Sequence, residues 1–164
     1  MAFTCPTCGK AHDDLPDVGA DRPDPVWDVE ESELQRRVKL TPDTCVIDDE
    51  HFFIRGVILI PILDTEEHFG FGVWVSQKRE NFQIYLEHPE DATIGPFFGW
   101  LSTRIRYYRP ADTYLLKTRA HFRGNKLRPS IEVEPTDHPL AVDQREGITM
   151  AKAWDIVHSC MPKS

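Results

Sequence analysis

Two cysteines near the start of the sequence have the spacing of a metal-binding turn. Cys5 and Cys8 lie three positions apart in the segment FTCPTCGKAH, and Gly9 follows them directly. A C-x-x-C turn can bring two thiolates onto one zinc ion, which takes about four nitrogen or sulfur ligands in a tetrahedron. Glycine lets the chain bend back at this point because it has no Cβ. The sequence therefore predicts a zinc site built on residues 1–12.

The remaining ligands of this zinc site must come from outside the C-x-x-C turn. Cys45 is the expected third ligand, because it begins a strand just after a helix ends. The fourth is either His12, which is close in sequence, or His51, which shares a face with Cys45 if residues 48–50 form a three-residue hairpin loop. A site closed by protein ligands leaves no position for a substrate, so its expected role is structural. The alternatives are free thiols or a redox pair, although a redox pair normally begins a helix in a βαβ unit and a Pro-rich loop follows this one.

Charged side chains alternate along residues 114–123 with the period of a β-strand. One face holds Lys117, Arg119, His121 and Arg123, and the next strand adds Glu132 and Glu134 to it. One interpretation is a hairpin with cross-strand Arg/Lys–Glu ion pairs, each contributing up to about 1 kcal/mol. The other is a polar site for an anionic ligand. Two carboxylates on the same face favour the ion pairs.

The run 134–144 places an imidazole among carboxylates between a strand and a helix. An Asp–His pair can do acid–base chemistry, so Glu134, Asp137 and His138 could form a hydrolase-like centre. The pair His138-Pro139 is also typical of a helix start, with proline in the first turn. No Ser or Cys lies beside His138 to act as a nucleophile, so no catalytic residue is assigned. The candidate ligand-binding residues are Arg119, His121, Glu132, Glu134, Asp137 and His138.

Strands and a few helices must position these groups. Apolar periodicity predicts strands near 45–47, 51–61, 69–75, 97–103, 114–123 and 130–134. It predicts helices near 29–40, 77–88 and from 149 onward, and a turn or short helix at 139–146. Cys160 falls on the apolar face of the last helix, where an inert core thiol is expected. The predicted fold class is α+β, mainly an antiparallel sheet with two or three helices and an N-terminal zinc-knuckle-like segment.

Length and charge limit the possibilities further. The 164 residues are enough for one domain, divided into a metal knuckle (1–12), an acidic Pro-rich loop (13–28) and an α+β body (29–164). The longest apolar run is too short to span a membrane, and no secretory signal is visible, so the expected compartment is the cytoplasm. The net charge is −8, yet residues 104–128 hold eight Lys or Arg against one acid. This segment could bind nucleic acid, although the overall acidity counts against it.

Five sequence motifs follow one another along the chain: TCPTCGKAH (4–12), DDEHFFIRG (48–56), GVWVS (72–76), FFGWL (97–101) and RPSIEVEPTDHPLAVDQREGIT (128–149). In this order, from about Phe3 to Val157, the chain resembles a bacterial family of uncharacterised proteins, the domain of unknown function 2199. The resemblance implies a single cytoplasmic domain with no assigned activity. The opening C-x-x-C-G-x-x-H of that family supports a metal knuckle at Cys5, Cys8 and His12.

These observations favour a non-enzymatic, zinc-stabilised domain that binds a partner protein or a small anionic ligand. An immunity-type protein is a specific version, by analogy with other small acidic α+β domains. The alternative is a hydrolase-like enzyme centred on Glu134, Asp137 and His138. A further alternative is nucleic-acid binding by residues 104–128, and no membrane contact is expected.

Overall fold

The structure is a computed structural model that describes residues 3–4, 11–12, 18–125 and 127–160. Its strands are β1 (Phe3–Thr4), β2 (Ala11–His12), β3 (Val18–Gly19), β4 (Val38–Leu40), β5 (Thr44–Ile47), β6 (His51–Pro61), β7 (His68–Gln77), β8 (Phe97–Trp100), β9 (Lys117–His121) and β10 (Ser130–Val133). Its α-helices are α1 (Leu34–Arg37), α2 (Arg79–Glu87), α3 (Pro139–Glu146) and α4 (Met150–Cys160). Three short 3-10 helices, η1 (Asp24–Asp28), η2 (Glu31–Glu33) and η3 (Arg106–Tyr108), lie between them.

Most of the described strands form one sheet in the order β3-β7-β6-β10-β9-β8. The β4–β5 hairpin extends this sheet, because β5 pairs with the first part of β6. β3 runs parallel to β7, and β10 runs parallel to β6, whereas the other pairs are antiparallel. The sheet is therefore mixed, which corrects the expectation of a mainly antiparallel sheet. Long connections precede both parallel pairings, and such pairings leave no local pattern in the sequence.

The sheet curls so that the chain after β8 returns to β7. Leu101 forms an antiparallel bridge with Val75. The backbone N–H of Ser102 donates to the Trp74 carbonyl oxygen at 2.8 Å, and the Trp74 N–H donates to Thr103 Oγ1 at 3.0 Å. These contacts join the two ends of the run β7-β6-β10-β9-β8. The sheet consequently has an inner face, which it encloses, and an outer face.

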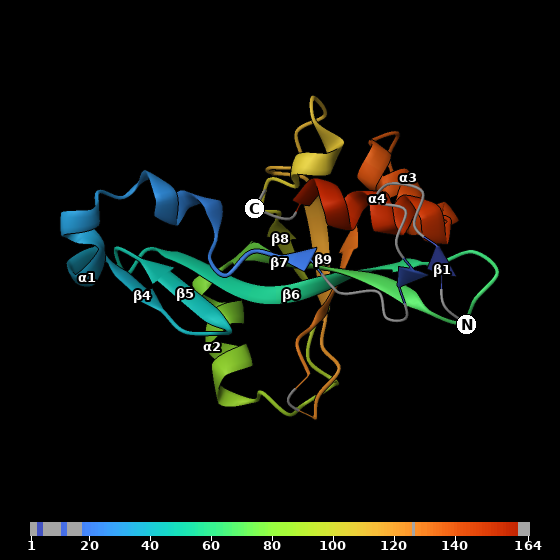
Figure 1. Cartoon of the computed structure of the whole chain (residues 1–164). Helices are drawn as coiled ribbons and strands as arrows, with labels where there is room; N and C mark the ends of the chain where they lie inside the picture. The colour runs from blue at the N-terminus through green and yellow to red at the C-terminus, as the bar shows by residue number, and fades with distance from the viewer. Residues whose placement is uncertain (1–2, 5–10, 13–17, 126, 161–164) are drawn as a thin grey trace.

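The inner face of the curled sheet carries the main apolar core. Ile58 and Ile60 of β6 are fully buried there and pack in one cluster with Phe71 of β7. Leu140 of α3 and Ile156 of α4 belong to the same cluster, so these helices cover part of the inner face. Figure 1 shows α3 and α4 together on one side of the molecule, with α1 and the β4–β5 hairpin on the other.

A second apolar cluster lies on the outer face near the start of β6. Cys45, Phe53 and Trp74 are buried in it. Val26 and Val29, from η1 and the residue after it, belong to the same cluster. The chain that precedes the sheet therefore covers one end of the outer face and leaves the β8–β9–β10 end uncovered by this cluster.

The helices after residue 77 form close to where the sequence predicts them. α2 spans Arg79–Glu87, and α3 spans Pro139–Glu146. Gly147 ends α3 with a φ of +85°, a conformation that favours glycine. α4 then begins at Met150. No helix within the described residues is long and apolar enough to cross a membrane.

The prediction of one helix over 29–40 is wrong in part. The structure has the single α-helical turn α1 in this stretch, followed by β4, which pairs with β5. Leu34 and Val38 are the only repeating apolar positions, so a longer helix would bury little surface. Arg37 instead forms a two-point ion pair with Asp48, at 2.8 Å for each contact. Residues 38–40 form hydrogen bonds with β5 in place of the hydrogen bonds of a helix.

Candidate functional site

The outer face of β8, β9 and β10 brings together four of the six candidate ligand-binding residues: Arg119, His121, Glu132 and Glu134. Phe98 of β8 is paired with Arg119 of β9, which is paired in turn with Glu132 of β10. The inward-facing Thr118 is buried, so the expected alternation along β9 is confirmed. We call this surface the β8–β10 face; it consists of Phe98, Trp100, Lys117, Arg119, His121, Glu132 and Glu134.

Two aromatic side chains of β8 lie side by side on the β8–β10 face. Phe98 is 45% exposed and Trp100 is 41% exposed. Their rings meet edge to face, with centroids 5.1 Å apart. The strand turns both outward because the buried Gly99 between them packs against Ser76 of β7. Large aromatic side chains dominate the binding energy of many protein interfaces, so this exposed pair is a candidate contact site.

Charged groups surround a hollow of about 340 Å³ beside Phe98. The hollow is lined by Phe98, Lys117, Thr118, Arg119, Glu132, Glu134 and Pro135. The Nε2 atom of His121 lies 3.0 Å from Glu132 Oε1 across the hairpin, whereas the ion pairs between described residues include none of the expected Arg/Lys–Glu pairs on this face. The His121 and Glu132 side chains are about half exposed, so their pair contributes little to stability. The hollow therefore offers groups of both charge signs to a partner.

A second hollow, of about 400 Å³, borders Trp100. His51, Tyr114 and Leu115 also line it. Leu115 is half exposed and has a φ of +68°, which side chains other than glycine and asparagine rarely adopt. Its backbone N–H donates to the Leu101 carbonyl oxygen at 2.7 Å, and this bond holds the unusual conformation. Backbone strain beside exposed aromatic groups is typical of functional surfaces.

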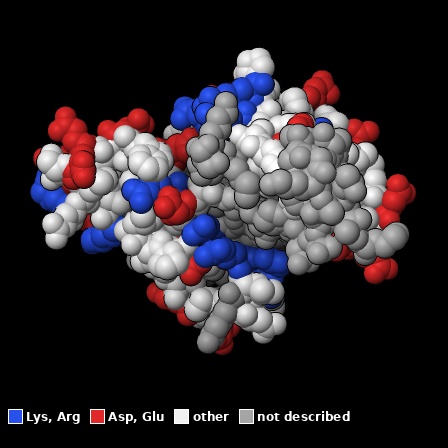
Figure 2. Space-filling view, in the orientation of Figure 1, with Lys and Arg blue, Asp and Glu red and all other residues white. Residues whose placement is uncertain are grey.

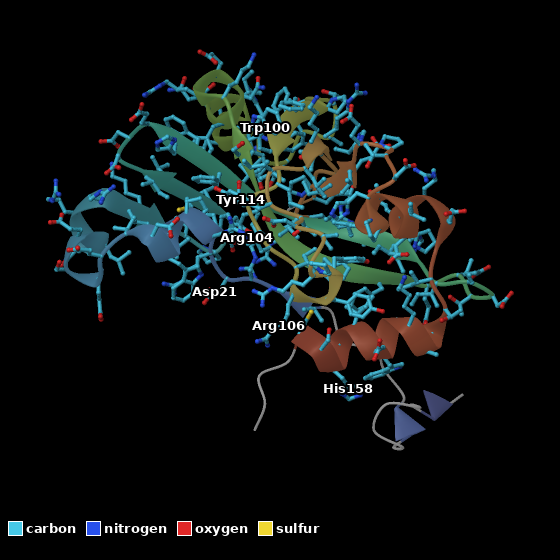
Figure 3. All side chains as sticks on the ribbon, turned by 90° about the horizontal axis from the view of Figure 1, so that it is seen from above. Asp21, Trp100, Arg104, Arg106, Tyr114 and His158 are labelled. Carbon is cyan, nitrogen blue, oxygen red and sulfur yellow. The ribbon has the colours of Figure 1, made fainter. Side chains whose placement is uncertain are left out.

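Arg104 extends this aromatic surface towards η3. Its guanidinium carbon lies 4.2 Å from the centroid of the Tyr114 ring. The Arg104 backbone N–H donates to Asp24 Oδ2 at 2.9 Å, and its Nε lies 3.6 Å from Asp112 Oδ2. Figure 3 shows Trp100, Tyr114 and Arg104 following one another along the surface. The guanidinium of Arg104 therefore holds the Tyr114 ring on the same surface as Trp100.

Both ring nitrogens of His138 are bound by backbone groups. Nδ1 accepts from the Leu140 N–H at 3.0 Å, and Nε2 lies 3.1 Å from the Asp112 carbonyl oxygen. Nδ1 must be unprotonated because its partner is a donor, and Nε2 must be protonated because its partner is an acceptor. The ring caps α3, and both of its nitrogens are engaged by backbone groups. Glu134 and Asp137 are exposed, and no hydrogen bond between described residues joins them to His138.

A comparison with protein-family profiles matches residues 4–148 to DUF2199, described as an uncharacterized protein conserved in bacteria. The chain belongs to this bacterial family. The matched range contains the whole β8–β10 face of the DUF2199 chain and ends before α4. No curated protein and no solved structure matches the chain.

The predicted metal ligands of the DUF2199 chain are placed only in part. Cys5 and Cys8 lie outside the described residues, and His12 is described only as a position in β2, paired with β1. Cys45 and His51 share a face of the β5–β6 hairpin, whose loop has the expected three residues. Cys45 is fully buried among apolar side chains, whereas His51 is exposed. In the part of the chain that the structure describes, no group of three or more His, Cys, Asp or Glu could hold a metal ion, so zinc stays a prediction.

Cys45 is expected to resist alkylation in the folded protein. Burial raises the pKa of its thiol from 9.0 to about 11. Near pH 8 this shift lowers the thiolate fraction about 100-fold, and the thiolate is the form that reacts. Iodoacetamide labelling followed by peptide mass mapping checks this expectation, with and without denaturant. The partly exposed Cys160 provides an internal comparison. Labelling of Cys45 at the same rate in native and unfolded protein would show that its thiol is accessible after all.

The basic residues of 104–128 are divided among separate surfaces. Lys117 and Arg119 line the hollow beside Phe98, Arg123 and Arg128 line another hollow, and Arg104 and Arg109 line a third. A single nucleic-acid strand needs a continuous basic groove. In the described part of this segment, these basic residues line three separate hollows.

A buried polar network that sequence reasoning missed joins η3, α3 and α4. Tyr108 Oη donates to Asp143 Oδ2 at 2.7 Å, and Lys152 Nζ donates to Asp143 Oδ1 at 2.8 Å. Burial, with the neighbouring carboxylate, raises the pKa of Tyr108 well above its usual range, so the phenol stays a donor. Asp143 is 7% exposed. Its place on α3, next to other polar residues, carries no signal in the sequence that it is buried.

Proposed function

We propose that this DUF2199 chain is a non-enzymatic binding protein that takes a partner protein on its β8–β10 face. The observation that carries the proposal is the exposed Phe98–Trp100 pair, with a hollow beside each ring. Soluble proteins rarely leave large aromatic side chains in contact on their surface unless the patch has a partner. Tyr114 continues the patch beyond Trp100.

The charges of the face favour a protein over a nucleic acid. Lys117 and Arg119 line the same hollow as Glu132 and Glu134. A protein surface offers both charge signs and apolar side chains, whereas a phosphate backbone would meet two carboxylates here. Electrostatic complementarity of this kind chiefly selects the partner and accelerates association. The aromatic pair then supplies the apolar contact area.

Replacing Trp100 by alanine is expected to weaken the complex about 30-fold, which corresponds to about 2 kcal/mol for a central aromatic contact. The check uses a photo-crosslinking amino acid at Lys117 in bacterial cells that carry the full chain. We expect a discrete adduct of higher mass that is strongly reduced when Trp100→Ala is added. Thermal unfolding of the purified variant should change little, because Trp100 is exposed.

The matched control places the same crosslinker at Leu86 of α2, which is 52% exposed. Leu86 lies outside the β8–β10 face, so no equivalent adduct is expected there. Equal adducts at Lys117 and Leu86, or an adduct at Lys117 that persists after Trp100→Ala, would refute the proposed face. Absence of any adduct at Lys117 in growing cells would count against a protein partner.

A further inference from the structure

Three arginines line a hollow of about 700 Å³ at another part of the outer face. Arg55 comes from β6, whereas Arg123 and Arg128 come from the connection between β9 and β10. Asp43 is the acid in the lining. Figure 2 shows Lys and Arg side chains gathered near the middle of this face, with an acidic side chain beside them. The hollow is thus a concentration of positive charge on a chain whose net charge is −8.

Arg55 is fixed at this hollow with an unused donor. Its Nη1 donates to the Pro42 carbonyl oxygen at 3.2 Å, and its guanidinium carbon lies 5.8 Å from the centroid of the Trp74 ring. Its Nε is buried and has no hydrogen-bond partner among the described residues. Burial lowers the pKa of Arg55, and the like charge of Arg128 lowers it further, against the carboxylates of Asp21 and Asp43. A guanidinium has five N–H donors, and the one contact to Pro42 leaves donors of the Arg55 Nη groups for an anion in the hollow.

Arg123 and Arg128 are also held in place by their own contacts. Arg128 Nε donates to Asp43 Oδ1 at 2.9 Å. Arg123 Nε donates to the Arg128 carbonyl oxygen at 2.8 Å. Each of these contacts uses one nitrogen of a guanidinium that has five N–H donors. Among the described residues of the lining, three arginines face one carboxylate, which leaves an excess of positive charge and of donors there.

The floor of the hollow is apolar and open. Val57 and Leu59 of β6 line it and are half-buried. Their partners across the sheet are Gly72 and Gly70 of β7; the backbone of Gly19 lies over Gly72, with its Cα 3.1 Å from where a Cβ of Gly72 would be. Leu127, which is half exposed, lies at the rim. The hollow thus combines a cationic side with an apolar floor.

We propose that this hollow binds a small organic anion, with a carboxylate or phosphate-ester group among Arg55, Arg123 and Arg128 and an apolar body over Val57 and Leu59. Guanidinium groups bind both kinds of anion through paired N–H donors. The volume lies in the range of small-molecule sites. The site is separate from the β8–β10 face and does not depend on a protein partner.

Isothermal titration calorimetry of the full chain tests this site with hexyl phosphate, hexanoate and hexanol. We expect at least one of the two anions to bind about 10-fold tighter than hexanol, as one charge-assisted contact provides. The comparison between the anions shows which head group the site prefers. Arg128→Gln and Arg55→Lys should each weaken the anion about 10-fold, and thermal unfolding verifies that both variants fold. Arg106→Gln, on η3, should leave the affinity unchanged.

Three results would overturn the proposal. The first is no anion binding at millimolar concentrations, and the second is equal affinity for hexanol and the anions. The third is an affinity that Arg128→Gln and Arg55→Lys leave unchanged. A short single-stranded DNA that binds tighter than either small anion, and that needs the same arginines, would also replace it with a nucleic-acid site.

Discussion

Replacing Asp143 by alanine is expected to lower the free energy of unfolding by about 3 kcal/mol, as removing one partner from a buried charged hydrogen-bond network does. The carboxylate of Asp143 accepts from Tyr108 Oη at 2.7 Å and from Lys152 Nζ at 2.8 Å. Tyr108 is only 6% exposed, so its hydroxyl would lose its partner in a place that water reaches poorly. The network connects η3, α3 and α4, and these elements cover the inner face of the sheet.

Urea unfolding of a small series of variants measures this effect. Asp143→Asn keeps an acceptor for the Tyr108 hydroxyl, so it should cost less than Asp143→Ala. Tyr108→Phe removes one hydrogen bond and should cost about 1 kcal/mol. Asp137→Ala provides the matched control, because Asp137 is an exposed acid just before α3. An Asp143→Ala variant as stable as Asp137→Ala would show that the network does not hold these helices.

The elements of the fold were predictable where a local pattern defines them. The alternation of Lys117, Thr118 and Arg119 identifies a strand with one buried face, and the structure has it in β9. His138-Pro139 and Gly147 mark the two ends of α3. The parallel pairing of β10 with β6 has no such pattern, because it depends on a connection that returns across the sheet. The curl that brings Leu101 to Val75 is likewise a property of the whole sheet.

The candidate site was predictable to a similar extent. Arg119, His121, Glu132 and Glu134 share a strand face that alternation reveals, and the structure places them on the β8–β10 face. His138 was a candidate because of its neighbours in sequence, but its ring is used to cap a helix. The cluster of Arg55 with Arg128 could not be foreseen, because Arg55 lies on β6 and Arg128 lies in the β9–β10 connection, and the two segments meet only in the folded sheet.

Replacing Gly99 by alanine is expected to destabilise the fold by about 2–3 kcal/mol, the cost of forcing a group into a filled space. A Cβ at this position would lie 2.7 Å from Gln77 Nε2 and would overlap the Ser76 backbone oxygen. The backbone of β7 cannot shift without breaking its hydrogen bonds to β6, so β8 must move away from β7. The hydrogen bonds from Thr118 Oγ1 to the Gly99 oxygen, at 2.8 Å, and from the Trp100 N–H to Ser76 Oγ, at 3.1 Å, would then be lost.

Gly99→Ala should also abolish crosslinking at the β8–β10 face, because Phe98 and Trp100 flank Gly99 and would move with the strand. Phe98→Ala provides the matched comparison on the same strand. It removes an exposed ring without touching β7, so it should reduce crosslinking while the urea midpoint stays near that of the parent chain. If Gly99→Ala left both the urea midpoint and the adduct at Lys117 unchanged, β8 would not be held by β7. If Gly99→Ala lost stability but kept the adduct, the partner would contact residues other than the aromatic pair. Stability and crosslinking are therefore measured on the same two variants. Gly99→Ala tests the contact between β8 and β7, and Phe98→Ala tests the exposed ring that the partner is expected to contact.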